Sequence, residues 1–312
     1  MRILVVGAGA TGGYFGGRLA QAGRDVTFLV REKRAEELRR AGLVIKSPRG
    51  DLTLRDVKTV LASQIAQPYD LVLLSCKAYN LDDAIESFAP AVGESTMILP
   101  VLNGMRHIDV LKQRFGASKV LGGQCVIAAT LNREREIVQL NDMHSIGFGE
   151  LDGGISERVR NVAAAFDGAG FDSAASDNIL QQMWEKWVFL ATLACSTSLH
   201  RAAIGDILKT PDGRRVIEGI LGECKSVASA NGYAIGDASN ARAQTILFAE
   251  GSPLTASMLR DIEGQSRIEA DHIVGDLIAR GGDAQKEGAL TLLRIAYSHL
   301  KAYEARLARQ SA

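Results

Sequence analysis

The sequence predicts an α/β domain with a doubly wound parallel sheet, followed by an all-helical C-terminal domain. Short apolar runs alternate with helical stretches in the first half of the chain, and a glycine-rich turn follows the first of these runs. After about residue 175 the strand-like runs stop and long amphipathic stretches take over. A chain of 312 residues has room for two such domains.

The predicted parallel sheet begins at the N-terminus. Ile3 to Val6 is a short apolar run that ends in glycines, which is typical of a buried parallel strand. A helical pattern follows to about Ala22, and residues 25–30 form the second expected strand. Further apolar runs lie at 70–75, 97–102 and 120–128, and helical stretches separate most of them.

Two segments depart from this alternation. Residues 43–60 alternate around a Pro-Arg-Gly-Asp turn and predict an inserted hairpin. Residues 136–150 predict another extended segment.

The second half of the chain predicts long helices and shows neither a long linker nor a repeat. We place the domain boundary so that residues 1–173 form the first domain and residues 174–312 the second. The expected helices cover 177–200, 212–231, 237–249, 255–280 and 285–308.

Composition excludes several classes of protein. Lysine plus arginine and aspartate plus glutamate balance at 36 each, so no excess of positive charge indicates nucleic acid or an anionic membrane. No window reaches ~18 uninterrupted apolar residues, and the N-terminal apolar run is too short for a signal peptide. The 4 cysteines and 5 histidines lack metal-binding spacing. We therefore expect a cytoplasmic, metal-free protein with reduced cysteines.

The glycine-rich turn fits the dinucleotide-binding pattern GxGxxG with Gly7, Ala8, Gly9, Ala10, Thr11 and Gly12. It follows a strand and opens a helix, which is the context that the pattern requires. Gly7 would allow the tight turn, Gly9 would let the backbone approach a pyrophosphate, and Gly12 would let helix and strand pack closely. A glycine-rich turn without a ligand is the alternative. We favour a Rossmann-type nucleotide-binding domain.

The residue after the second strand bears on the choice of cofactor. NAD enzymes usually place an acidic residue there, but this chain has Arg31. A guanidinium suits a 2′-phosphate, which favours NADP(H). The alternative is a solvated charge run, because residues 31–40 hold four Arg, one Lys and three Glu.

Lys186 lies in an unusually apolar helical stretch, QMWEKWVFLATLA at 182–194. Lysine is rarely buried unless it is paired or functional. The stem could pack while the ammonium reaches water. In an apolar cleft its pKa would instead fall from ~10.4, and it could exchange a proton near neutral pH.

These motifs together resemble the ketopantoate reductase (2-dehydropantoate 2-reductase) family over nearly the whole chain. The matching segments are GAGATGG at 7–13, Arg31, CKAYN at 76–80, LNGM at 102–105, MWEKW at 183–187, SMLRDI at 257–262 and EADHIVG at 269–275. Most are weak singly, but their order and spacing are specific.

The resemblance implies roles for particular residues. Lys186 would donate the proton and Glu269 would lie beside it and the nicotinamide ribose. Asn103 would contact cofactor and substrate, Lys77 would lie near the cofactor, and Ser257 would bind substrate. Ordinary alternatives are a turn for Asn103-Gly104, a helix cap for Ser257, and solvent-facing positions for Lys77 and Glu269.

The chain departs from the family at the substrate. Leu190, Ala194, Ile204 and Val274 stand where the family usually has asparagines. Loss of amides that hold hydroxyl groups should cost affinity for pantoate. Arg201 could supply a carboxylate contact instead, although a surface position is the simpler alternative.

The resulting expectation is NADPH-dependent reduction of a 2-oxo acid to a 2-hydroxy acid. Ketopantoate is the first substrate and a more apolar keto compound the second. A non-catalytic NADP(H)-binding regulator and a β-hydroxyacid-type dehydrogenase are the rivals. The expected partner is the small-molecule 2-oxo acid, with no nucleic acid or membrane. A homodimer is one possible oligomeric state, but no feature of the sequence predicts the number of subunits.

Overall fold

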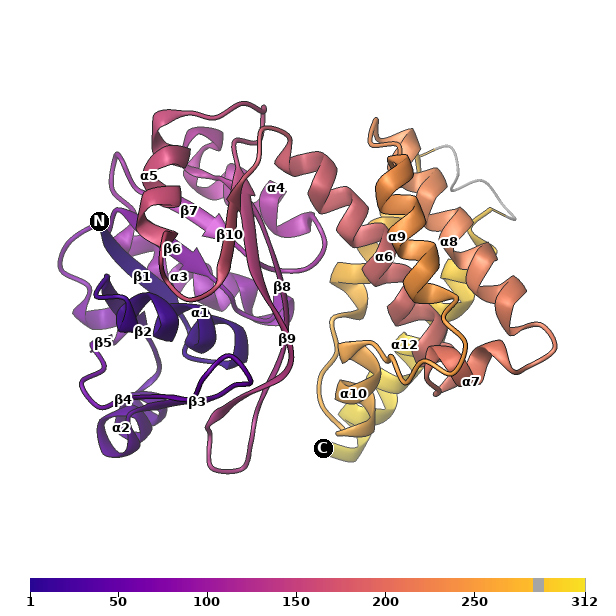
Figure 1. The fold of residues 1–312 in the computed structure, drawn as a ribbon, viewed down its shortest axis with the longest axis horizontal. Coiled ribbons are helices and arrows are strands. Elements are labelled where there is room, and N and C mark those ends of the chain that lie inside the picture. The colour runs from indigo at the N-terminus through magenta and orange to yellow at the C-terminus, as the bar shows by residue number, and fades with distance from the viewer. Residues whose placement is uncertain (283–288, 312) are drawn as a thin grey trace. The chain divides into compact units, whose positions relative to one another are not determined.

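The computed structural model describes residues 1–282 and 289–311, and the chain divides into two compact units (Figure 1). The first comprises Met1–Leu102 and His107–Leu180, and the second comprises Asn103–Arg106 and Gln181–Ala312. The sequence-based boundary at 173/174 falls inside strand β10 (Asp172–Ala175). That strand pairs with β9 (Ile137–Gly149), so it is part of the first unit.

The first unit contains the predicted parallel sheet, with strands in the order β5-β2-β1-β6-β7. All four neighbouring pairs are parallel. The central strands are short and apolar, so they can be covered on both faces. The strands are β1 (Arg2–Val6), β2 (Asp25–Leu29), β5 (Thr59–Val60), β6 (Leu71–Leu74) and β7 (Met97–Pro100).

A second, mixed sheet holds the segments that departed from the alternation. The hairpin expected within 43–60 is confirmed for β3 (Leu43–Lys46) and β4 (Leu52–Leu54), which pair antiparallel. Its last part is different, because Thr59–Val60 joins the parallel sheet as β5. The run at 120–128 belongs to β8 (Gly122–Leu131), which pairs antiparallel with β9 and lies in this second sheet.

Helix α1 (Ala10–Gln21) packs between the two sheets, and its glycines explain how it fits. A Cβ on Gly16 would lie 2.7 Å from Phe28 of the parallel sheet, and one on Gly17 would lie 2.8 Å from Leu43 of the mixed sheet. Glycines on two faces of one helix therefore let both sheets approach its backbone.

The other helices of the first unit are short. They are α2 (Glu32–Ala41), α3 (Leu81–Phe88), α4 (Arg106–Phe115) and α5 (Glu157–Phe166), with 3₁₀ turns η1 (Ala62–Gln64), η2 (Ala78–Asn80), η3 (Ala89–Ala91) and η4 (Ala117–Lys119). Ser156 caps α5, since its hydroxyl accepts from the Val159 amide.

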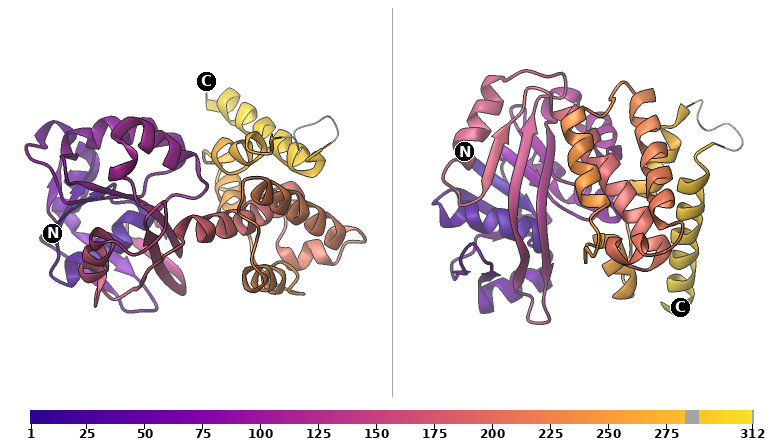
Figure 2. Two further views of the ribbon diagram at one scale, coloured as in Figure 1. Left: turned by 90° about the horizontal axis from the view of Figure 1, so that it is seen from above. Right: turned by 45° about the vertical axis from the view of Figure 1, so that its right-hand side comes forward.

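All regular secondary structure in the described part of the second unit is helical, as predicted (Figure 2). The helices expected at 177–200, 212–231 and 237–249 are confirmed, and a short helix at Ile204–Leu208 was not predicted. The bounds are α6 (Ile179–His200), α7 (Ile204–Leu208), α8 (Gly213–Ala230), α9 (Asp237–Leu247), α10 (Ser257–Glu263), η5 (Asp271–Gly275), α11 (Asp276–Ala279) and α12 (Thr291–Ser311).

The single helix expected over 255–280 is wrong. Helix α10 ends at Glu263, and Gln265 then adopts a left-handed φ of 52°. Helical structure resumes as the π-helix η5, which continues into α11. The start of the helix expected at 285–308 lies partly outside the described residues; α12 begins at Thr291.

Membrane-spanning helices and metal-binding clusters are both absent from the described residues. Within residues 1–282 and 289–311, no helix is long and apolar enough to cross a bilayer. The same residues contain no group of three or more His, Cys, Asp or Glu placed to hold a metal ion.

Candidate functional site

The glycine loop of the first unit has the geometry that a dinucleotide needs. Gly7 has a φ of 91°, which favours glycine, and a Cβ on Gly9 would meet no other atom within 4 Å. By contrast, a Cβ on Gly12 would lie 2.1 Å from Ser75 Oγ and 2.6 Å from the Gly7 carbonyl oxygen. The structure therefore contains the tight turn at Gly7, the open space for a ligand at Gly9 and the close packing at Gly12. This loop, including Ala8, Ala10 and Thr11, fits a pyrophosphate.

Lys77 lies beside this loop in the topology of the parallel sheet. It follows β6, which pairs with β1, and it precedes the 3₁₀ turn η2. The carboxyl ends of these two strands form the point where the strand order reverses, and nucleotides bind there in such sheets. Lys77 is half-buried, which agrees with a side chain at the edge of a site better than with a freely solvated one.

Arg31 lies at the end of the second strand and is the residue that precedes α2. Its side chain is 83% exposed, and a 3.6 Å ion pair with Asp83, which is 75% exposed, holds it only weakly. The guanidinium is therefore available to an anionic group of a nucleotide.

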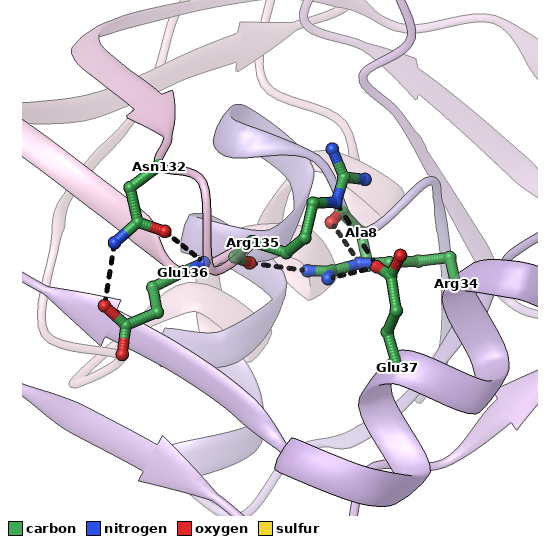
Figure 3. Close-up of polar contacts among 6 residues, drawn as sticks. All are labelled: Ala8, Arg34, Glu37, Asn132, Arg135 and Glu136. Carbon is green, nitrogen blue, oxygen red and sulfur yellow. Dashed lines mark hydrogen bonds and ion pairs between the residues drawn. The ribbon is translucent and has the colours of Figure 1, made fainter.

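Arg34, in the same charge run, has a different role that the sequence did not reveal. Its Nε donates to the Ala8 carbonyl oxygen at 3.2 Å, and its Nη1 donates to Glu37 at 3.0 Å (Figure 3). Arg135 also donates to Glu37, and the Arg34 guanidinium lowers the pKa of that carboxyl. Arg34 is thus committed to holding the glycine loop. Its spacing of three residues before a glutamate was the only signal in the sequence.

The second unit contains the lysine that the sequence singled out. Lys186 is half-buried on α6, while its neighbours Trp184 and Trp187 are 2% and 1% exposed. The indole of Trp187 donates to the Ile273 carbonyl oxygen, which ties α6 to the π-helix η5. The two tryptophans beside Lys186 therefore lie on the face of α6 that packs into the core.

Asn103 contacts Lys186. The ammonium Nζ donates to Asn103 Oδ1 at 3.1 Å. Residues 103–106 follow β7 in sequence but belong to the second unit, and Gly104 has the left-handed φ of 78° that a turn at Asn-Gly requires. Asn103-Gly104 is therefore a turn, and this turn presents the asparagine side chain to the lysine. The turn alternative and the role predicted for Asn103 are thus compatible.

The segment that carries Glu269 contacts the same turn. Glu269 is 9% exposed, which rules out the solvent-facing alternative. Three residues later, His272 is 6% exposed and packs on Gly104. Burial lowers the pKa of His272, while the Glu269 and Asp276 carboxylates act to raise it. His272 lies within the segment EADHIVG, but no feature of the sequence predicted it as a site residue.

Two further predicted residues lie at the surface of the second unit. Ser257 is exposed and is the first residue of α10, but Ala256 holds the N-cap position, so Ser257 is not the cap. Arg201 is exposed directly after α6, with a left-handed φ of 53°. Their predicted contacts with substrate stay predictions.

The residues that replace asparagines differ in accessibility. Ile204 and Val274 are fully buried and Ala194 is 3% exposed. Leu190 is half-buried and lies one turn after Lys186 on α6. Of the four, Leu190 is therefore the apolar side chain best placed to meet a bound molecule near the lysine.

The chain is similar to known reductases along almost all of its length. The family model described as "Ketopantoate reductase PanE/ApbA" matches residues 3–153, and the model of its C-terminal part matches residues 178–304. The chain is 37% identical over 305 residues to an uncharacterised oxidoreductase, YkpB, of Bacillus subtilis, covering 98% of this chain and 99% of that one.

Solved structures give the same result. A 2-dehydropantoate 2-reductase from Geobacter metallireducens superposes with a TM-score of 0.86 at 30% identity, covering 97% of this chain and 99% of that one. A D-mandelate dehydrogenase with NADH and anilino(oxo)acetate superposes with a TM-score of 0.86 at 22% identity, covering 98% and 99%, and shows the shared fold. The predicted fold class is confirmed, and the chain is an oxidoreductase that belongs to the ketopantoate reductase family.

Proposed function

We propose that the protein is an NADPH-dependent reductase that converts a 2-oxo acid to the corresponding 2-hydroxy acid. The observation that carries the proposal is the hydrogen bond from Lys186 Nζ to Asn103 Oδ1. A neutral amide oxygen orients the ammonium without neutralising it, so the lysine keeps a proton that it can give to a reacting oxygen. A regulator that only bound NADP(H) would need the glycine loop and Arg31 but not this pair.

The chain's residues divide the work as follows. The loop at Gly7–Gly12, Lys77 and Arg31 would hold the cofactor, and Arg31 would favour the 2′-phosphate of NADP(H). When bound, NADPH supplies the hydride for the ketone carbon. Lys186 donates its proton to the oxygen on which negative charge grows, and Asn103 and Ser257 hold the substrate. Glu269 would lie beside the lysine and the nicotinamide ribose.

Ketopantoate is the first candidate substrate, because the family name and the Geobacter relative point to it. A more apolar 2-oxo acid is the second, and half-buried Leu190 one turn after Lys186 favours it. A hydroxyl that finds no partner at an apolar surface loses its hydrogen bonds to water, which selects against pantoate-like substrates. The proposal keeps the cytoplasmic location expected from the sequence.

A substrate screen that follows NADPH absorbance tests the proposal. Ketopantoate is compared with a 2-oxo acid of similar size without the hydroxyl, and with branched and aryl 2-oxo acids, in wild type, Leu190→Asn and Arg201→Ala. The apolar assignment expects wild type to favour the hydroxyl-free acid, Leu190→Asn to move the preference toward ketopantoate, and Arg201→Ala to weaken both.

The outcomes separate the candidates. A clearly higher kcat/KM for ketopantoate in wild type would assign the first substrate and discard the apolar one. No oxidation of NADPH with any 2-oxo acid would reject the reductase and leave the regulatory protein.

A further inference from the structure

We propose that His272 is a positioning residue, which holds the Asn103–Gly104 turn in place and so orients Lys186 for proton transfer. The inference rests on the proposed function and adds a residue to it. It depends on three contacts, all within the second unit: between His272 and Gly104, between His272 and Asn103, and between Asn103 and Lys186.

The first contact is one of shape. A Cβ on residue 104 would lie 2.9 Å from His272 Cδ2 and 2.9 Å from the His272 carbonyl oxygen. Real Cβ atoms do not approach other atoms so closely, and Gly104 also has a φ of 78°. The imidazole and the backbone of His272 therefore both pack directly on the turn, which only glycine permits.

The second contact is a hydrogen bond. The imidazole of His272 bonds to the main chain of Asn103, and this bond acts to raise the pKa of the histidine. A bond that favours the protonated ring is one in which a ring N–H donates to the carbonyl oxygen. His272 is 6% exposed, so water does not compete with this bond.

The third contact passes the constraint to the lysine. With the Asn103 backbone fixed, its side-chain Oδ1 lies 3.1 Å from Lys186 Nζ. A lysine stem has several rotatable bonds and loses much rotamer entropy when its end is fixed. An acceptor that is itself held in place lowers the cost of fixing the ammonium at each turnover, which is how positioning raises kcat.

His272 contacts the turn from a segment of unusual helix geometry. His272 lies in the π-helix η5, which spans Asp271–Gly275 between the irregular segment after α10 and helix α11. A π-turn has a wider backbone than an α-helix and often occurs at functional sites. Trp187 donates to the Ile273 carbonyl oxygen at 2.9 Å, so η5 is also fastened to the helix that carries Lys186.

The test is a double-mutant cycle in the full-length protein. His272→Phe keeps a planar ring over Gly104 and removes the donor, while Asn103→Ala removes the acceptor of the lysine. We expect His272→Phe to lower kcat about 10- to 100-fold with little change in the KM for NADPH. When His272→Phe is combined with Asn103→Ala, kcat should fall hardly further than in Asn103→Ala alone, because both changes remove the same constraint.

Two further variants separate positioning from packing. His272→Asn or His272→Gln restores an N–H donor on a smaller side chain, and recovery of kcat by either would support the hydrogen bond. The matched control is His200→Phe, since His200 also bonds a main-chain carbonyl oxygen in this unit, that of Ser196 at 2.8 Å, without contacting the turn. It should leave kcat unchanged.

Retained kcat in His272→Phe, or additive losses in the double mutant, would overturn the proposal. So would loss of NADPH binding together with turnover, because it would mean general disruption. If wild type reduces no 2-oxo acid, the proposed function fails, and the positioning is then tested without turnover. For that test the lysines are methylated with ¹³C, and the NMR signal of Lys186 is assigned by its loss in Lys186→Arg. The titration curve of this signal should differ between wild type and His272→Phe. Identical curves would reject the positioning role of His272.

Discussion

At the residue scale, Lys186 shows how far burial alone can indicate function. Its apolar neighbours predicted that the side chain was unusual, and the structure places it half-buried with its ammonium on Asn103 Oδ1. The partner could not be read from the sequence, because the two residues are 83 positions apart and only the fold brings them together. His272 was hidden for the same reason.

Replacing Lys186 should remove catalysis and leave the cofactor in place. For Lys186→Ala we expect kcat to fall about 10²- to 10⁴-fold, as for the loss of a general acid. Binding of NADPH, followed by its fluorescence, should be unchanged because the glycine loop is intact. Lys225→Ala is the matched control, since Lys225 also donates to an asparagine in this unit, Asn240 at 2.9 Å. An undiminished kcat in Lys186→Ala would leave the lysine a merely packed side chain.

Arg31 should decide between the two nicotinamide cofactors. Arg31→Ala is expected to raise the KM for NADPH by roughly tenfold or more, since a charge-assisted hydrogen bond contributes about 1.5–3 kcal/mol. The KM for NADH should hardly change. Arg39→Ala, an exposed member of the same charge run, is the control and should affect neither. Equal use of both cofactors by wild type would contradict the role of Arg31.

At the scale of elements, sequence patterns predicted what local periodicity specifies. The parallel strands, the β3–β4 hairpin and the helices α6, α8 and α9 follow from alternation and amphipathicity. The break after α10 was missed although the sequence signalled it, because Gly264 is a stop signal and residues 264–269 are polar apart from Ile268. The π-turn at Asp271–Gly275 has no sequence signature, since it depends on tertiary contacts such as that from Trp187.

Two glycines of one loop should respond differently to the same added methyl group. Gly12→Ala would place a Cβ 2.6 Å from the Gly7 carbonyl oxygen and should destabilise the first unit by about 1–3 kcal/mol. Gly9→Ala meets nothing within 4 Å, so the fold should keep its stability to within about 1 kcal/mol. It should nevertheless weaken NADPH binding, because the methyl group stands where the pyrophosphate approaches. Thermal unfolding of both variants measures the change in stability, and titration with NADPH measures the change in binding. Undisturbed NADPH binding in Gly9→Ala would contradict the pyrophosphate site at the glycine loop.

At the scale of the whole molecule, each unit buries a histidine that resists protonation. In the first unit, the Tyr14 hydroxyl and His144 Nδ1 share a hydrogen bond of 2.7 Å, and His144 is 6% exposed. Burial lowers the pKa of His144, and the Arg49 charge lowers it further. His272 is the counterpart in the second unit, where burial again lowers the pKa. Both units should therefore share one dependence on pH.

The free energy of unfolding should fall when the pH drops below about 6.5, the value of an unfolded histidine. Below this pH the histidines of the unfolded chain bind protons, whereas those of the folded chain stay neutral. The free energy of unfolding therefore decreases until the pH reaches the pKa values of the folded state. The slope is at most about 1.4 kcal/mol per pH unit for each histidine. Arg158 lowers the pKa of Glu150 from 4.5, so this carboxylate contributes only at lower pH. Urea unfolding at about pH 7.5 and about pH 5.5 therefore isolates the histidines. His144→Phe should flatten the slope for the first unit alone, whereas equal stability of wild type at both pH values would contradict the argument.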